Sequence, residues 1–182
     1  AIEVAIKMQL ELTTLNIQLI KEDKSPLAIG IGINTGRVVV GNMGSDQRFD
    51  YTCLGDGVNL AARLEGQTKA YGVGILLGQE TVNLIRNKFK FIELDKIAVK
   101  GKKEGITVYT VLNDQFNYIL HDTFLKHYKN RDWVKAENTL NKSIKENTEL
   151  EFYYNMMKDR VADLKSNDPG EDWDKVYRAI SK

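Results

Sequence analysis

The chain has 182 residues and a formal net charge of +1, and charged residues make up 28% of it in a well-mixed pattern. This length accommodates one domain or a domain with an appendage, and the near-neutral charge excludes the strongly basic surface typical of nucleic-acid-binding proteins. The single cysteine, Cys53, cannot form an internal disulfide, and no apolar run approaches the roughly 20 residues that cross a membrane. We expect a cytoplasmic location and no nucleic-acid partner, and an upstream membrane or sensor segment is compatible with both expectations.

The first part of the chain predicts an α+β domain. Strong helix formers with apolar residues at helical spacing predict a helix over residues 1–21. Apolar alternation then predicts an antiparallel meander of three strands, over residues 27–34, 37–40 and 47–54, with turns at 35–36 and 41–46. The elements expected next are a helix over 58–71, a strand over 74–77, a helix over 79–87, and two strands, 89–99 and 106–112, joined by a lysine-rich hairpin loop at 101–105.

Residues 113–182 differ in character, because glycine is reduced to Gly170 and aromatic residues recur at helical intervals. Two helices on either side of Asp132 resemble one tetratricopeptide-like helix pair, a third helix covers about 150–165, and a short segment begins at 172–174. Repeat arrays need about three units to bury their apolar faces. We therefore expect this all-α tail to pack on the preceding domain or on a protein partner, as a brace or as a docking element.

The most informative stretch of the sequence covers residues 49–66. A strand-like run breaks at the Gly-Asp-Gly sequence 55–57, and a helix follows that carries Asn59 and Arg63 at a separation of i, i+4. This separation places the two side chains on one face of the helix, one above the other. An amide beside a guanidinium near a helix start can bind phosphate and ribose oxygens. The alternative is an exposed polar face on a helix whose apolar residues fill a core.

The run from residue 29 to 66 resembles the second half of the catalytic domain of class III nucleotidyl cyclases. The likeness continues through Leu-Leu-Gly-x-Glu at 76–80 and Val-Lys-Gly at 99–101 to the strand at 106–112. Several motifs in order over so much chain are far more specific than any single motif. The resemblance implies a partial cyclase domain of ferredoxin-like α+β fold over residues 1–113, with an antiparallel sheet and flanking helices, followed by the all-α tail 114–182.

The resemblance also implies an activity. The family's adenylate cyclases convert ATP to 3′,5′-cyclic AMP and pyrophosphate at the interface of two head-to-tail domains, here a homodimer, with two Mg²⁺ or Mn²⁺ ions. By resemblance, Asn59 orients the ribose, Arg63 stabilises charge that develops on the α-phosphate, and Lys100 reaches the terminal phosphates. Without the family pattern, Lys100 would be no more than a loop lysine beside other lysines.

Thr52 occupies the family position that helps to read the base. A hydroxyl residue there is typical of a mainly bacterial subgroup of adenylate cyclases, whereas guanylate cyclases commonly carry cysteine. In this chain the cysteine is Cys53, one residue later. Neighbouring strand residues point to opposite faces, so we expect Thr52 to face the adenine pocket. Cys53 is expected on the other side as a small buried hydrophobe.

The chain differs from the family pattern in one respect. The two metal-binding aspartates normally lie upstream of the helix that begins here at residue 1, so we expect no metal ligand in this chain. The chain resembles the C-terminal piece of a cyclase and is expected to be inactive by itself. One alternative is a non-catalytic cyclase-like module that binds a nucleotide or a regulatory partner. Another is a helical interaction module in which residues 114–182 are the working part.

Overall fold

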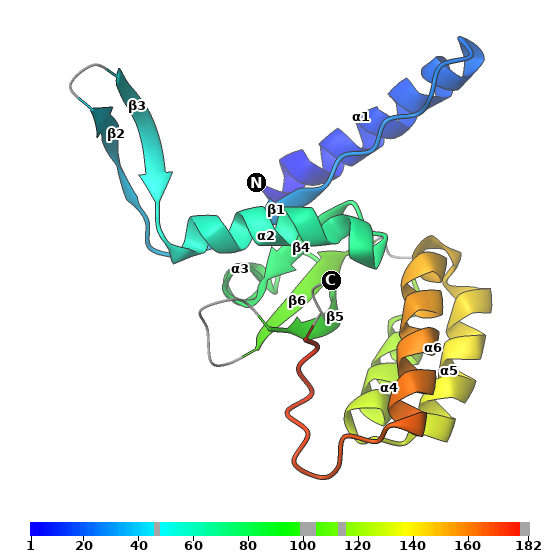
Figure 1. Cartoon of the computed structure of the whole chain (residues 1–182). Coiled ribbons are helices and arrows are strands. Elements are labelled where there is room, and N and C mark those ends of the chain that lie inside the picture. Colours follow the sequence, from blue (N-terminus) through cyan, green and yellow to red (C-terminus); the bar gives the residue numbers. More distant parts are fainter. Residues whose placement is uncertain (46–47, 99–104, 113–115, 179–182) are drawn as a thin grey trace. The chain divides into compact units, whose positions relative to one another are not determined.

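The computed structural model describes residues 1–45, 48–98, 105–112 and 116–178 (Figure 1). The chain forms two compact units, of which the first comprises Ala1–Ala70 and Gly74–Ile85 and the second Tyr71–Val73 and Arg86–Lys182. The helical tail therefore belongs to the same unit as the last strands of the predicted α+β domain. No helix in the described part of the chain combines the length and apolar character needed to cross a bilayer.

The first unit begins with helix α1, Ile2–Lys21, which confirms the helix predicted over residues 1–21. Strand β1, Ile31–Ile33, pairs in parallel with β4, Ile75–Gly78. The Gln9 side chain of α1 ties these elements together, because its Nε2 donates to the carbonyls of Ile29 and Gly74 at 3.0 Å each. Helix α3, Gln79–Ile85, follows β4 directly.

Helix α2, Asp56–Tyr71, is packed so closely on β1 and the residue before it that Gly32 and Gly30 cannot carry a side chain. A Cβ at Gly32 would lie 2.1 Å from the Ala61 carbonyl oxygen, and one at Gly30 would lie 2.1 Å from the Thr68 hydroxyl. Contacts this short are impossible for a real side chain, so a larger residue at either position would push the helix off the strand.

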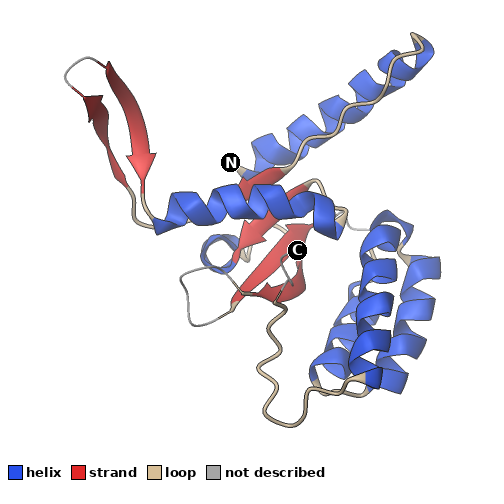
Figure 2. Cartoon of the chain, in the orientation of Figure 1, coloured by secondary structure: helices blue, strands red, loops and turns tan. Residues whose placement is uncertain are grey.

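Strands β2, Val39–Ser45, and β3, Arg48–Leu54, form a separate antiparallel hairpin, drawn as two red arrows in Figure 2. The predicted strand at 47–54 is thus confirmed, but the turn predicted at 41–46 was wrong, because β2 continues through Gly41 and Gly44. The glycines there weaken a strand without interrupting its ladder. The three-strand meander was wrong as well, since β1 pairs in parallel with β4 after the long crossover that parallel pairing requires.

The second unit is built on β5, Phe91–Ile97, and β6, Ile106–Val111, which pair antiparallel as predicted. The register shifts between Glu93 and Asp95, where β5 carries an irregularity of the β-bulge kind. The predicted hairpin loop at 101–105 lies almost wholly outside the described residues.

Three helices form the tail: α4, Tyr118–Lys129, α5, Trp133–Glu146, and α6, Glu151–Ser166 (Figure 1), with a 3₁₀ turn at Thr148–Leu150 before α6. They share one apolar core, whose fully buried side chains include Phe124, Leu140, Tyr153, Tyr154, Met157 and Val161. Helix α4 is capped by Asn117, whose side chain accepts from the Leu120 backbone N–H at 3.0 Å. The α+β fold with an all-α tail is confirmed, and the likeness of the tail to a tetratricopeptide pair stays a prediction.

The tail packs on strand β5, which is one of the two packing partners expected for it. Tyr153 donates its hydroxyl to the Leu94 carbonyl at 2.6 Å, and His121 Nε2 donates to the Glu93 carbonyl at 2.7 Å. A carbonyl only accepts, so the buried His121 carries its proton on Nε2 and its Nδ1 accepts from Tyr154 at 2.9 Å. The tail therefore covers a strand of the α+β domain.

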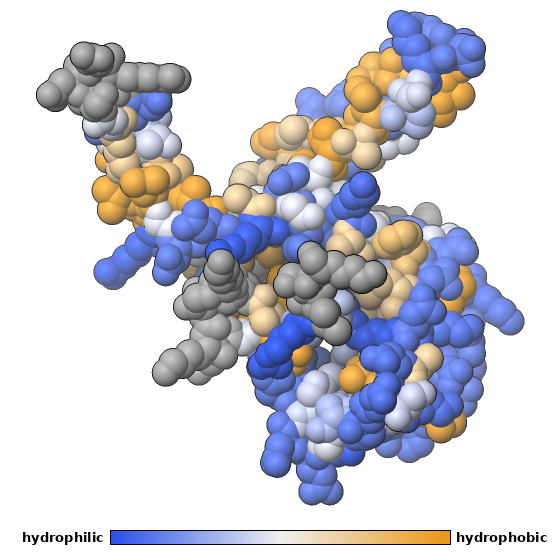
Figure 3. Space-filling view, viewed as in Figure 1, coloured by the Kyte–Doolittle hydropathy of each residue, from blue (hydrophilic) through white to orange (hydrophobic). Residues whose placement is uncertain are grey.

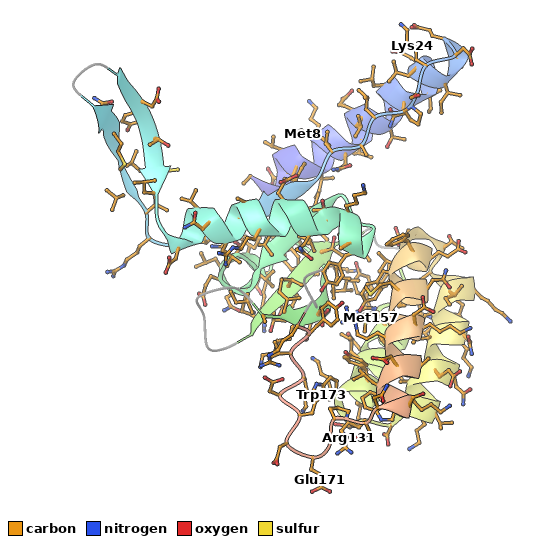
Figure 4. The ribbon with its side chains drawn as sticks, in the orientation of Figure 1. Met8, Lys24, Arg131, Met157, Glu171 and Trp173 are labelled. Carbon is orange, nitrogen blue, oxygen red and sulfur yellow. The ribbon has the colours of Figure 1, made fainter. Side chains whose placement is uncertain are left out.

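The Asp168 carboxylate joins the segment after α6 to the turn between α4 and α5. Asp168 accepts from Trp133 Nε1 at 2.5 Å and from Arg131 Nε at 3.0 Å. The Trp173 ring lies 5.3 Å from that of Tyr128 and 5.6 Å from that of Trp133. Figure 4 shows Arg131 and Trp173 at this same end of the helices. These contacts anchor the segment that follows α6.

Candidate functional site

The candidate site begins where β3 ends and α2 starts. Gly55 adopts a φ of +150°, and a Cβ there would lie 3.1 Å from the Arg37 carbonyl oxygen. Its own carbonyl accepts from the backbone N–H groups of Val58 and Asn59 at 3.1 and 3.2 Å, which opens the helix. The predicted strand break and the helix after it are therefore confirmed, with the helix starting two residues earlier than predicted, at Asp56.

A polar loop supports this helix start, and sequence reasoning did not single it out. Asn34 Nδ2 donates to the Gly57 carbonyl at 3.2 Å, and Asn34 Oδ1 lies 2.3 Å from where a Cβ at Gly78 would stand. The next residue, Thr35, shares a hydroxyl hydrogen bond of 3.0 Å with Thr81. The sequence signal was a polar Asn-Thr-Gly run directly after a predicted strand, a common place for ligand-facing residues.

Asn59 and Arg63 share the exposed face of α2. Leu60 and Leu64 of the same turns are buried, at 7% and 0% exposure. The helix therefore combines the two interpretations that the sequence left open. One face packs in a core, and the other face carries an amide and a guanidinium. Both polar side chains lie in the first half of the helix, towards the N-terminal end whose dipole favours anionic groups.

Thr52 and Cys53 lie on β3, the strand that leads into α2. Thr52 is paired with Gly41 and Cys53 with Val40 in an unshifted register, so their side chains point to opposite faces of the hairpin. Cys53 is exposed, and its expected burial was wrong. The reason is that β2 and β3 form a two-stranded ribbon, on which even Val39 and Tyr51 are 67% and 77% exposed.

Figure 3 shows apolar side chains at the base of this hairpin and along α1. Met8 of α1, labelled in Figure 4, is 47% exposed.

The structure brings Asn59 and Arg63 together on one helix face and places Thr52 on the adjoining strand. Lys100 lies outside the described residues, so its position stays a prediction.

Metal binding was tested on the described residues. They contain no group of three or more histidine, cysteine, aspartate or glutamate side chains arranged to hold a metal ion.

The family model for the adenylate and guanylate cyclase catalytic domain matches residues 1–113, which is more than half of the chain. The chain belongs to this family. An adenylate cyclase of Anabaena cylindrica is 40% identical over 121 residues, covering 61% of this chain and 24% of that protein. The terminal-differentiation-specific adenylate cyclase of Dictyostelium discoideum is 36% identical over 118 residues, covering 63% and 6%.

Among solved structures, the adenylyl cyclase CyaB from P. aeruginosa is similar with a TM-score of 0.57 at 39% sequence identity. The match covers 63% of this chain and 58% of that one. The chain thus spans less than two thirds of each of these three relatives. The matched region contains the whole of α2 and the β2–β3 hairpin, whereas the tail helices lie beyond it.

Proposed function

We propose that this chain contributes the nucleotide-binding half-site of an adenylate cyclase, which converts ATP to 3′,5′-cyclic AMP and pyrophosphate. The observation that carries the proposal is α2, which begins at a glycine-fixed turn and exposes Asn59 and Arg63 on one face within the family match. The names of the relatives in Anabaena and Dictyostelium, both adenylate cyclases, support ATP as the substrate.

In the proposed reaction, the ribose 3′-hydroxyl gives up its proton to water and its oxygen forms a bond to the α-phosphorus, while the bond from that phosphorus to the bridging oxygen breaks and pyrophosphate leaves. Asn59 holds the ribose so that its hydroxyl is aligned with that phosphorus. Arg63 donates to the oxygens of the α-phosphate, on which charge builds in the transition state. Lys100 is assigned to the terminal phosphates, as a point charge on a flexible stem. Thr52 is assigned to contact the adenine, and the chain is proposed to belong to the subgroup with a hydroxyl residue at this position.

Two divalent ions, Mg²⁺ or Mn²⁺, supply charge neutralisation in this reaction class. Their ligands are proposed to lie in the segment expected upstream, where the two metal-binding aspartates of this family normally lie. The 182-residue chain alone should therefore give no product with ATP and either ion.

We also propose that the site is completed by a second cyclase domain in a homodimer. The exposed apolar side chains of the β2–β3 hairpin support such a contact, since Val39, Tyr51 and Leu54 are each more than half exposed. Large exposed apolar patches mark interaction surfaces more often than free surface. For the tail, a protein partner is a secondary proposal that applies to the faces not packed on β5.

Base selectivity tests the proposal. ATP and GTP compete in one reaction with the protein that carries this chain and the segment expected upstream, and the two cyclic products are quantified. Thr52→Ala should narrow the preference for ATP, because a missing hydroxyl leaves the base without its polar partner. Cys53→Ser is the matched control and should change neither the preference nor the stability, since Cys53 is exposed. ATP binding without any cyclic product would favour the non-catalytic module instead.

A further inference from the structure

The C-terminal end of α2 is bound by the helical tail, all within the second unit. Tyr71, the last residue of α2, is 2% exposed and donates its hydroxyl to Asp95 Oδ2 at 2.6 Å. Asp95 lies at the irregularity of β5, where the register shifts. Its other oxygen accepts from the Lys96 backbone N–H at 2.8 Å. The bulge thus turns a carboxylate towards the end of the helix.

An arginine from the tail completes this buried cluster. Arg160 of α6 places Nη1 2.5 Å from the Asp95 oxygen that Tyr71 also contacts. The side chains of Arg160 and Asp95 are 10% and 1% exposed. The Tyr177 ring covers the guanidinium at 3.6 Å, and Tyr177 is held by backbone hydrogen bonds to Lys96 and Ala98. One carboxylate therefore joins α2, β5, α6 and the chain's last described segment.

A second contact closes around the same turn. Gly72, the residue after α2, has a φ of +64°, and a Cβ there would lie 2.4 Å from a ring carbon of Phe152 in α6. The Tyr71 ring also lies 6.5 Å from that of Tyr153. The start of α6 thus packs on the left-handed residue that ends α2, at a point where only glycine leaves room.

We propose that Tyr71, Asp95 and Arg160 are positioning residues through which the tail fixes the C-terminal end of α2, the helix whose first half carries Asn59 and Arg63. A packed helix moves as a rigid element, so holding one end restricts the other. The consequence for turnover rests on the proposed function, whereas the fixing of α2 does not. A brace that only adds stability is the competing explanation.

The protonation states of Tyr71 and Arg160 keep both groups as hydrogen-bond donors to Asp95. Burial and the neighbouring Asp95 carboxylate raise the pKa of the Tyr71 hydroxyl well above its ordinary value, so it stays a donor at neutral pH. Burial opposes the charge on Arg160, but the attraction and hydrogen bond of Asp95, together with the neighbouring Tyr128 and Tyr71, outweigh it and raise the pKa of the guanidinium. Neither donor is lost within the pH range in which the protein would work.

Hydrogen exchange on the 182-residue chain tests the fixing of α2. Tyr71→Phe removes one hydroxyl that bonds a carboxylate, while Tyr154→Phe is the matched control, because its buried hydroxyl bonds His121 and Asn147 within the tail. We expect backbone amides along α2 to exchange at least about tenfold faster in Tyr71→Phe. The control should leave α2 unchanged even if it lowers the melting temperature. Equal α2 protection in wild type and Tyr71→Phe, or equal loss in both variants, would overturn the proposal.

A second arm measures cyclase turnover in the protein that carries this chain and the segment expected upstream. Tyr71→Phe should lower kcat at least about fivefold with little change in KM, since substrate contacts stay intact and their alignment is lost. Arg160→Lys should retain more turnover than Arg160→Met, because it keeps the charge beside Asp95. An inactive wild type would refute the proposed function and leave the exchange test standing. Full turnover in Tyr71→Phe, with α2 already exchanging faster, would overturn the catalytic part of the inference.

Discussion

Replacement of Arg160 by methionine should destabilise the second unit strongly. Among the described residues, the substitution leaves Asp95 as a charge at 1% exposure that is hydrogen-bonded to the Tyr71 hydroxyl and the Lys96 backbone N–H. Breaking a buried ion pair by removing one member typically costs about 3–5 kcal/mol, because the remaining charge is uncompensated. At about 2–4 °C per kcal/mol for a protein of this size, the melting temperature should fall by about 10 °C.

Urea unfolding followed by tryptophan fluorescence measures this loss directly, because both tryptophans, Trp133 and Trp173, belong to the second unit. The double variant Arg160→Met with Asp95→Asn should recover more than half of the lost free energy, since the amide keeps an acceptor for Tyr71 without a buried charge. A loss below about 1 kcal/mol in the single variant would mean that the pair is solvated. A double variant as unstable as the single one would show that packing, and not charge, is lost.

Two further predictions concern the second unit. Burial lowers the pKa of His121 from 6.5 to about 4 in the folded protein. As the pH falls, the unfolded chain therefore protonates its His121 before the folded protein does. The contribution of neutral His121 to stability is complete above pH 6.5 and falls by about 3 kcal/mol as the pH falls towards 4. Urea midpoints between pH 7 and 4 should show this slope, which His121→Leu should remove and His127→Asn should retain. Gly72→Ala should lower the free energy of unfolding by about 1–3 kcal/mol, because φ is +64° and the new Cβ would clash with Phe152. Adding Phe152→Ala should restore only the steric part of that loss, and full restoration would show that the backbone conformation carries no cost.

Local patterns predicted most of the helices, because helix formers and apolar spacing act over neighbouring residues. The helix at residues 1–21 and the break before α2 followed from such patterns. The pairing of β1 did not, because a parallel ladder joins strands whose partners lie more than 40 residues apart, such as Ile31 and Ile75. Turn residues also misled the interpretation at Gly41, where an isolated hairpin tolerates glycine within its ladder.

Sequence patterns likewise predicted one part of the candidate site and missed the cluster that holds the end of its helix. The spacing of Asn59 and Arg63 on one helix face is a property of the helix period, and the structure reproduces it. The cluster of Tyr71, Asp95 and Arg160 had no sequence signal, because residues from three separate elements meet only after the tail has folded onto β5. The burial expected for Cys53 failed because alternation along a strand gives opposite faces but does not say which face is covered.

The steady-state kinetics of Arg63→Ala with ATP, in the protein that carries this chain and the segment expected upstream, decide whether α2 supplies a catalytic guanidinium. Lys69→Ala, at an exposed position in the last turn of the same helix, is the control. Arg63→Ala should lower kcat about 100-fold to 1,000-fold with a much smaller effect on KM, since the guanidinium acts on charge that develops in the transition state. Wild-type kcat in Arg63→Ala, or a change confined to KM, would contradict this role.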